Sequence, residues 1–258
     1  MAAKLPITDL RLHRAGSGPA LVLLHCLGMD RHLWDSAVAR LKGRFTLLTY
    51  DMPGHGATPV PAGPYTIEDL AAQLRELLAR EGVARAHVAG MSLGGLVAQD
   101  FAARCPGMVE KLALVDTTAR YTDDMRNMWV QRAAEARSAG VSSLTEGILK
   151  IWFTEEFVKS GAPAVKQVRE TFARASGEGY ALACEALRAA DLRPLVPAIQ
   201  APTLVICGDQ DVPPFIEAAK WLHGQIRGSR LEWLSPARHA SPLEQPEAFI
   251  RLLEGFLA

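Results

Sequence analysis

The chain lacks any long apolar run. No stretch of its 258 residues approaches the roughly 18 consecutive apolar residues of a membrane-spanning helix. Residues 1–18 mix charged residues with proline and glycine, and so lack the apolar core of a signal peptide. We therefore expect no membrane association and a cytoplasmic location.

An excess of one charge is also lacking. The 28 Lys and Arg residues balance 28 Asp and Glu residues, and no run of adjacent basic residues is present. A nucleic-acid-binding protein needs a basic face to displace counterions from phosphates. We therefore expect no nucleic-acid partner.

Cysteines are few and widely spaced. Cys26, Cys105, Cys184 and Cys207 form no C-x-x-C pair, which disfavours a zinc site and a disulfide scaffold. The glycine-rich dinucleotide and phosphate-binding motifs and the H-E-x-x-H zinc motif are missing too. The sequence thus predicts no metal and no other cofactor, with buried thiols in a reducing compartment.

Short apolar runs alternate with helical segments. Runs of this length, apolar on both faces, are typical of strands buried in a parallel sheet. Helical periodicity marks residues 66–80, 92–104 and 242–257. The alternation predicts an α/β fold with a mostly parallel sheet flanked by helices. The predicted strands are 20–25, 44–51, 86–91, 111–116, 202–207 and 230–234.

The alternation breaks between residues 119 and 190, where no strand-like run occurs. An all-helical block inserted between two sheet strands indicates a lid. We therefore expect residues 1–118 and 191–258 to form the core and 119–190 a helical lid. The candidate helices of the lid are 125–139, 143–152, 164–175 and 180–190.

The sharpest motif is Gly90-Met91-Ser92-Leu93-Gly94, at the junction of a predicted strand and helix. A tight strand-to-helix turn strains its middle residue and leaves little room for neighbouring Cβ atoms. It also presents the Ser92 hydroxyl at a helix N-terminus, where free N–H groups favour negative charge. The motif predicts Ser92 as a nucleophile; a glycine-rich packing turn is the structural alternative.

A serine nucleophile needs a base, and the base needs an orienting acid. His239 is the only histidine after the last predicted strand, and it lies downstream of Ser92 as the order Ser, acid, His requires. Asp211, after the fifth predicted strand, is the favoured acid. Asp209 is better suited to shaping the turn, and Asp116, at the end of the fourth predicted strand, is a rival.

Together these motifs resemble the α/β-hydrolase family over essentially the whole chain. The matching segments are His25-Cys26-Leu27-Gly28, Asp51-Met52-Pro53-Gly54-His55-Gly56, the Ser92 motif, Gly208-x-x-Asp211 and His239. Within the family the chain is most similar to the 3-oxoadipate enol-lactonase group. That similarity rests on His32-Leu33-Trp34-Asp35, Pro64-Tyr65-Thr66, Ile151-Trp152-Phe153 and Asp191-Leu192-Arg193.

The resemblance implies a cofactor-free carboxylic ester hydrolase whose oxyanion hole is formed by the backbone N–H groups of Leu27 and Leu93. Losing one such donor typically costs about 100- to 1000-fold in rate. Most of the wider family has His-Gly where this chain has His25-Cys26. The donors are backbone groups, so Cys26 is compatible with the hole, although its side chain is expected to narrow the pocket.

Substrate-binding residues are less directly indicated. Trp34, Trp129, Trp152 and Phe153 are candidates to line an apolar pocket under the lid, with core packing as the alternative. The resemblance favours Trp152, through its Trp-Phe pair. Arg188 is the candidate cation for a carboxylate-bearing lactone, with a surface salt bridge as the alternative.

The predicted function is hydrolysis of a small ester or lactone through an acyl-enzyme on Ser92. One alternative is perhydrolysis or haloperoxidase-like chemistry, in which peroxide replaces water at the same site. Another is a non-enzymatic receptor that keeps the site but only binds a small ligand. We expect a small-molecule partner, and a monomer or small homo-oligomer.

Overall fold

The computed structural model describes residues 5–258 and contains a seven-stranded sheet in the order β1-β3-β2-β4-β5-β6-β7. Strands β2 to β7 correspond to the six predicted strands and run parallel to one another. The α/β prediction is therefore confirmed. The strands are Leu12–Gly16 (β1), Ala20–Leu24 (β2), Thr46–Tyr50 (β3), Ala86–Met91 (β4), Val109–Val115 (β5), Thr203–Gly208 (β6) and Arg230–Leu234 (β7).

Strand β1 is an addition to the six predicted strands. It pairs antiparallel with β3, from Leu12 opposite Tyr50 to Gly16 opposite Thr46. Its residues are exposed or half-buried because it lies at the edge of the sheet. An edge strand of this kind has no continuous apolar run, which is the signal that identifies the buried strands.

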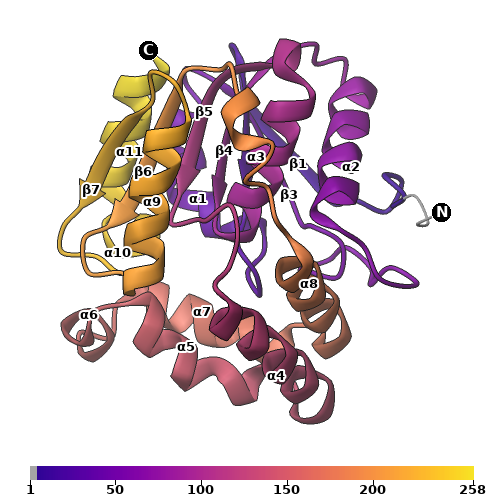
Figure 1. The fold of residues 1–258 in the computed structure, drawn as a ribbon, viewed down its shortest axis with the longest axis vertical. Helices are drawn as coiled ribbons and strands as arrows, with labels where there is room; N and C mark the ends of the chain where they lie inside the picture. The colour runs from indigo at the N-terminus through magenta and orange to yellow at the C-terminus, as the bar shows by residue number, and fades with distance from the viewer. Residues whose placement is uncertain (1–4) are drawn as a thin grey trace.

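Helices cover both faces of the sheet (Figure 1). One face carries α2 (Ile67–Arg80), α3 (Leu93–Arg104) and α9 (Pro213–Gln225). The other carries α1 (Asp35–Leu41) and α11 (Pro246–Leu257), which contact each other. Helix α3 is buried over most of its length and so holds its N-terminus firmly at the end of β4. Among the helices of residues 5–258, none combines the length and hydropathy needed to cross a bilayer.

The segment between β5 and β6 is helical, and Figure 1 shows it gathered at one end of the sheet. Helices α4 and α8 pack against each other there. The division into a core and a lid stays a prediction, and residues 1–4 of the expected core lie outside the described residues. The segment comprises α4 (Asp123–Ala139), α5 (Thr145–Trp152), α6 (Glu155–Lys159), α7 (Pro163–Arg174) and α8 (Gly177–Ala189).

The C-terminal helix differs from its prediction as one continuous helix over residues 242–257. It is divided into α10 (Ser241–Glu244) and α11, with Gln245 between them at φ −126° and ψ 58°. Pro246 is the cause, because proline disfavours helical geometry in the residue before it. The break gives α10 its own direction, close to the loop that carries His239.

Candidate active site

Ser92 follows β4 and immediately precedes α3, in a left-handed backbone conformation with φ 52°. Such a conformation is strained for a residue with a side chain. A Cβ at Gly90 would lie 2.2 Å from the carbonyl oxygen of Gly94, and one at Gly94 would lie 2.3 Å from that of Leu24. The turn therefore requires the glycines on both sides of Ser92, as the motif predicts.

Two further predicted residues lie beside Ser92. His239 Nε2 is 3.2 Å from Ser92 Oγ, and His239 Nδ1 is 2.8 Å from Asp211 Oδ2. All three side chains are buried. The other Asp211 oxygen accepts the Val212 N–H at 2.7 Å, which fixes the carboxylate. A hydrogen-bonded series of this kind can remove the proton of a serine hydroxyl.

Opposing effects act on the pKa of His239. Burial, the largest single effect, lowers it, whereas the charge and hydrogen bond of Asp211 raise it. The raising effects win, and the pKa of His239 lies above its usual value. Asp211 therefore stabilises the imidazolium more than burial destabilises it.

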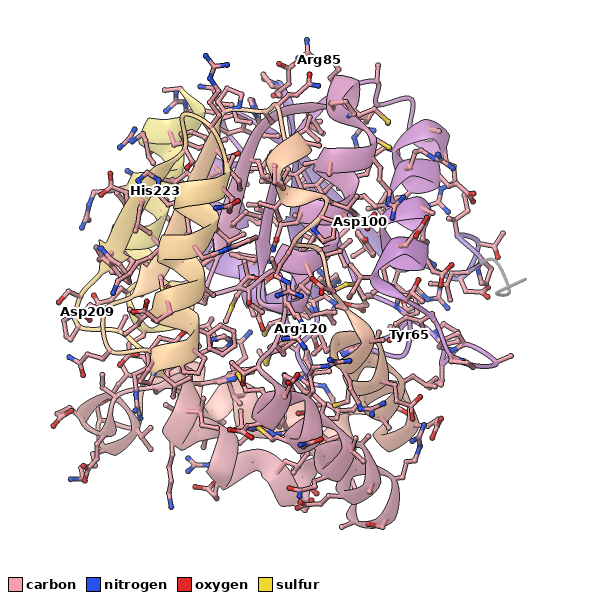
Figure 2. All side chains as sticks on the ribbon, viewed as in Figure 1. Tyr65, Arg85, Asp100, Arg120, Asp209 and His223 are labelled. Carbon is pink, nitrogen blue, oxygen red and sulfur yellow. The ribbon has the colours of Figure 1, made fainter. Side chains whose placement is uncertain are left out.

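Asp209 stabilises the loop that carries His239. Its carboxylate accepts the Ser235 hydroxyl at 2.7 Å and the Ala237 N–H at 3.1 Å. Figure 2 shows Asp209 at the end of the sheet that faces the helical segment. Asp209 thus contacts the turn rather than the imidazole, which is the turn-shaping geometry expected of it.

Asp116 supports the same loop from the side of the core. One of its oxygens accepts the Gly208 N–H at 3.0 Å, and the other accepts the N–H and hydroxyl of Ser241 at 3.1 and 2.7 Å. Burial, together with the charge of Asp211, raises the pKa of Asp116 to about 8. Its hydrogen bonds thus go to residues around His239, whereas Asp211 contacts the imidazole itself.

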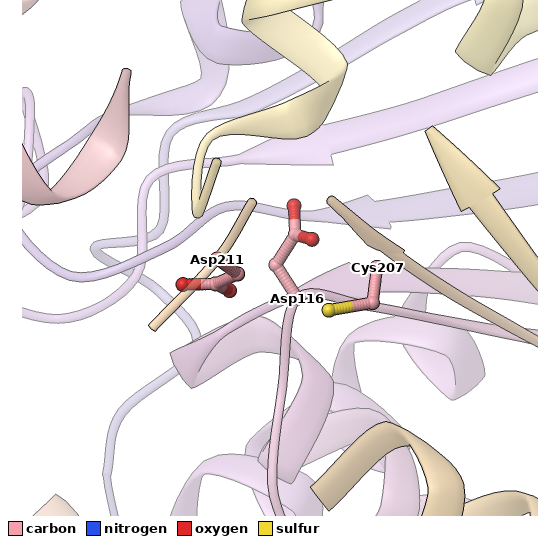
Figure 3. Close-up of side chains that lie close together, drawn as sticks. All are labelled: Asp116, Cys207 and Asp211. Atoms are coloured by element: carbon pink, nitrogen blue, oxygen red, sulfur yellow. The ribbon is translucent and has the colours of Figure 1, made fainter. Parts of the chain in front are cut away.

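Three buried groups come close enough together to be considered as metal ligands. Oxygen or sulfur atoms of Asp116, Cys207 and Asp211 lie within 4.8 Å of one another (Figure 3). Both carboxylates, however, already accept hydrogen bonds from neighbouring groups. Burial also raises the pKa of Cys207, which disfavours the thiolate that a metal requires. We therefore assign the two carboxylates to the support of His239 and its loop rather than to a metal.

The two backbone N–H groups expected to form the oxyanion hole belong to Leu27 and Leu93, residues at the Ser92 site. Leu93 is the first residue of α3, where N–H groups have no partner within the helix. Leu27 lines the same cavity as Ser92. Within residues 5–258 neither N–H has a hydrogen-bond acceptor. His25 holds the Leu27 loop in place, since its ring accepts the Met52 N–H at 2.9 Å.

Ser92 and His239 open into a cavity of about 250 Å³. Its far wall comes from the inserted helical segment and is almost entirely apolar. The side chains that complete the lining are Leu27, Met125, Met128, Trp129, Arg132, Ile148, Ile151, Trp152, Tyr180, Val212, Pro214 and Phe215.

Arg132 is the exception in this wall. It is half-buried, its guanidinium lies 5.2 Å from the centre of the Trp129 ring, and it lies beside the Tyr180 hydroxyl. Arg137, on the same helix, pairs with two glutamates. Arg132 forms no ion pair with any acidic residue in the described part of the chain. The cavity therefore contains an unpaired positive charge.

A model of the "Alpha/beta hydrolase family" matches residues 21–252. The chain belongs to the alpha/beta hydrolase family. The fold, with its seven-stranded and mostly parallel sheet, agrees with that membership.

Several alpha/beta hydrolases resemble the chain over nearly its whole length. It is 33% identical to 3-oxoadipate enol-lactonase 2 of Acinetobacter baylyi, covering 98% of this chain and 95% of that protein. It is 34% identical to a pimeloyl-[acyl-carrier protein] methyl ester esterase of Chromobacterium violaceum, covering 95% and 96%. The enol-lactonase crystal structure from Burkholderia xenovorans superposes with a TM-score of 0.92 at 37% identity, covering 96% of both chains.

Two predicted substrate-binding residues of this hydrolase lie outside the cavity. Trp34 is buried against Phe249, with ring centres 5.7 Å apart, and so serves core packing. The Arg188 side chain is exposed and absent from the cavity lining. Its position near the end of α8 directs it to solvent. Trp152 does line the cavity, as predicted.

Cys26 does not narrow the cavity of the hydrolase. Its side chain is buried in the core and is absent from the cavity lining, whereas the next residue, Leu27, is present there. Burial also raises the pKa of the Cys26 thiol, so it remains protonated at neutral pH. The Cys26 side chain therefore does not narrow the substrate pocket, contrary to expectation.

Arg132 is the residue that the sequence prediction misses. A signal for it exists: Met125, Met128, Trp129 and Arg132 recur at i, i+3, i+4 and i+7 along α4, and so share one face of the helix. A lone arginine in such an apolar stripe has to face either a partner or a ligand.

Proposed function

We propose that the protein hydrolyses carboxylic esters or lactones through an acyl-enzyme. His239 takes the proton of Ser92 as Ser92 Oγ attacks the carbonyl carbon, and Asp211 orients the imidazole and stabilises its cation. The alcohol leaves with a proton from His239. Water then attacks the acyl group with His239 as base, and Ser92 is regenerated.

The oxyanion of each tetrahedral intermediate is proposed to bind the N–H groups of Leu27 and Leu93. Two fixed donors stabilise a developing alkoxide because they need no reorganisation during the reaction. The absence of competing acceptors for these N–H groups supports the assignment. We also propose that residues 119–190 act as the lid of this site, since most of the cavity wall comes from them.

One observation carries the proposal, namely the hydrogen-bonded series Ser92–His239–Asp211 at the wall of a mostly apolar cavity. The names of the relatives favour an ester or lactone bond as the target. At about 250 Å³, the cavity lies below the usual 300–1,000 Å³ of small-molecule sites. Its size therefore favours a compact substrate such as a lactone.

Arg132 supports an anionic substrate. An unpaired guanidinium in a mostly apolar cavity interacts more strongly with a carboxylate than one at an open surface, because less water screens the pair. We propose that the substrate carries a carboxylate that pairs with Arg132 while its ester carbonyl lies at Ser92. This assigns to Arg132 the function that the resemblance implies for Arg188.

A hydrolysis screen tests the function. It includes a neutral aryl ester, a neutral lactone and a carboxylate-bearing enol-lactone, each with the parent protein and with Ser92→Ala. Turnover that Ser92→Ala abolishes supports the proposal. Binding without turnover would indicate a receptor, and product formation only with added peroxide would indicate perhydrolysis or haloperoxidase-like chemistry.

A further inference from the structure

Glu244, in α10, is a buried carboxylate without a cationic partner. Only 5% of it is exposed, and no Lys, Arg or His of residues 5–258 forms an ion pair with it. One oxygen accepts the N–H of Thr154 at 2.9 Å and also the Thr154 hydroxyl, and the other accepts the Arg238 N–H at 2.9 Å. Burying a carboxylate is costly unless such donors satisfy it.

The two segments that Glu244 joins both belong to the site. Arg238 directly precedes His239, and Thr154 follows the cavity residue Trp152 by two positions. A parallel contact runs from the Ala240 N–H to the Trp152 carbonyl at 2.9 Å. Arg238, before His239, is thus hydrogen-bonded to Glu244, and Ala240, after His239, is hydrogen-bonded to Trp152 of the inserted segment.

We propose that Glu244 is a positioning residue that keeps His239 in register with the cavity wall at Trp152. Glu244 is absent from the cavity lining, so it acts through the loop and not on the substrate. The inference rests on the proposed function, because it assigns to Glu244 the alignment of His239, the base of the proposed reaction. A displacement of about 1 Å in a reacting group can cost about 100-fold in rate.

Glu244→Gln tests the inference, because the amide keeps the shape but replaces one acceptor by a donor. Either the Arg238 N–H or the Thr154 N–H then loses its acceptor. We expect kcat per active site on a neutral aryl ester to fall about 10- to 100-fold, with KM changed by less than about twofold. Active sites are counted by complete labelling with a fluorophosphonate, so unfolded protein does not lower the value.

A spectroscopic signature accompanies the rate. The downfield proton resonance of the His239–Asp211 hydrogen bond should weaken or shift in Glu244→Gln. The matched control is Asp100→Asn, which alters another buried carboxylate that pairs with Arg104 on α3, well above the helical segment in Figure 2. The control should keep the parent kcat per labelled site even if it is less stable.

If Glu244→Gln does not fold, two milder variants at Thr154 test the inference instead. Thr154→Val removes the hydroxyl bond to Glu244, and Thr154→Ser retains it. We expect about a two- to fivefold loss of kcat per labelled site in Thr154→Val and parent behaviour in Thr154→Ser. If Glu244→Gln keeps the parent kcat per labelled site, the inference is wrong. If Glu244→Gln is unfolded, parent kcat per labelled site in Thr154→Val overturns the inference instead. Failure of the parent to label or turn over would instead refute the proposed function.

Discussion

The hydroxyl of Thr117 donates a hydrogen bond of 2.8 Å to the carbonyl oxygen of Ser92. The N–H of Ser92 in turn donates to the carbonyl of Val115 at 2.9 Å. Both backbone groups of the strained serine are therefore held by the end of the neighbouring strand β5. This support keeps Ser92 in a conformation that an isolated turn would relax.

Relief of that strain should be measurable. Glycine adopts positive φ without the penalty that a Cβ incurs. We expect the free energy of unfolding of Ser92→Gly to exceed that of Ser92→Ala by about 1 kcal/mol. Urea unfolding of the two inactive variants gives the comparison, and equal midpoints and slopes would show that the turn stores no strain at Ser92.

Ser92 should be the site of covalent labelling. A fluorophosphonate is expected to add one label per parent chain and none to Ser92→Ala, because only an activated serine reacts. Intact-mass spectrometry measures the stoichiometry. Stoichiometric labelling of Ser92→Ala would assign the nucleophile to another residue.

Asp211 should matter far more than Asp116 to turnover. Asp211→Asn removes the hydrogen-bond partner of His239 Nδ1, a change that costs about 10⁴-fold in kcat in a serine protease. Asp116→Asn alters the hydrogen bonds to Gly208 and Ser241 but none to the imidazole, and is expected to cost about tenfold. Steady-state kinetics on one aryl ester ranks the two variants, and the reverse order would move the orienting acid to β5.

The pH profile should reflect the raised pKa of His239. The base must be neutral to accept the serine proton, so kcat/KM should fall as the pH drops through the pKa of His239. Because Asp211 raises that pKa above its usual 6.5, the midpoint of the acidic limb should lie above pH 6.5. In Asp211→Asn burial still lowers the pKa of His239, but the charge of Asp211 no longer raises it. The midpoint should therefore move to lower pH. A midpoint that does not move would separate Asp211 from the titration of the base.

Arg132 should select between substrate classes. Arg132→Ala is expected to lower kcat/KM for a carboxylate-bearing lactone about 100-fold, since the carboxylate would enter an apolar cavity without a partner. Neutral esters should change little. The matched control is Arg188→Ala, which removes an exposed arginine outside the cavity and should leave both classes unchanged. Equal losses on both classes in Arg132→Ala would limit it to a structural role.

Local patterns were sufficient to predict the residues around Ser92, but not those around the substrate. The Ser92 turn is encoded in a few consecutive residues, and parallel strands bring their carboxyl ends to one edge. The apolar stripe along α4 marks Arg132, but whether Arg132 or Arg188 reaches the substrate depends also on how α4 and α8 pack against each other, which no local pattern specifies. Glu244 is a similar case, because its burial depends on contact with Thr154, 90 positions earlier in the chain.

The cavity wall has a consequence for how this protein can change. Most of the wall residues belong to one continuous stretch between β5 and β6, whereas Ser92, Asp211 and His239 follow β4, β6 and β7. Mutations in that stretch can therefore alter which molecules are accepted while the reacting groups keep their geometry. Randomising the α4 positions Met125, Met128 and Arg132 is thus a direct route to new selectivity, provided that Thr154 and its bond to Glu244 are preserved.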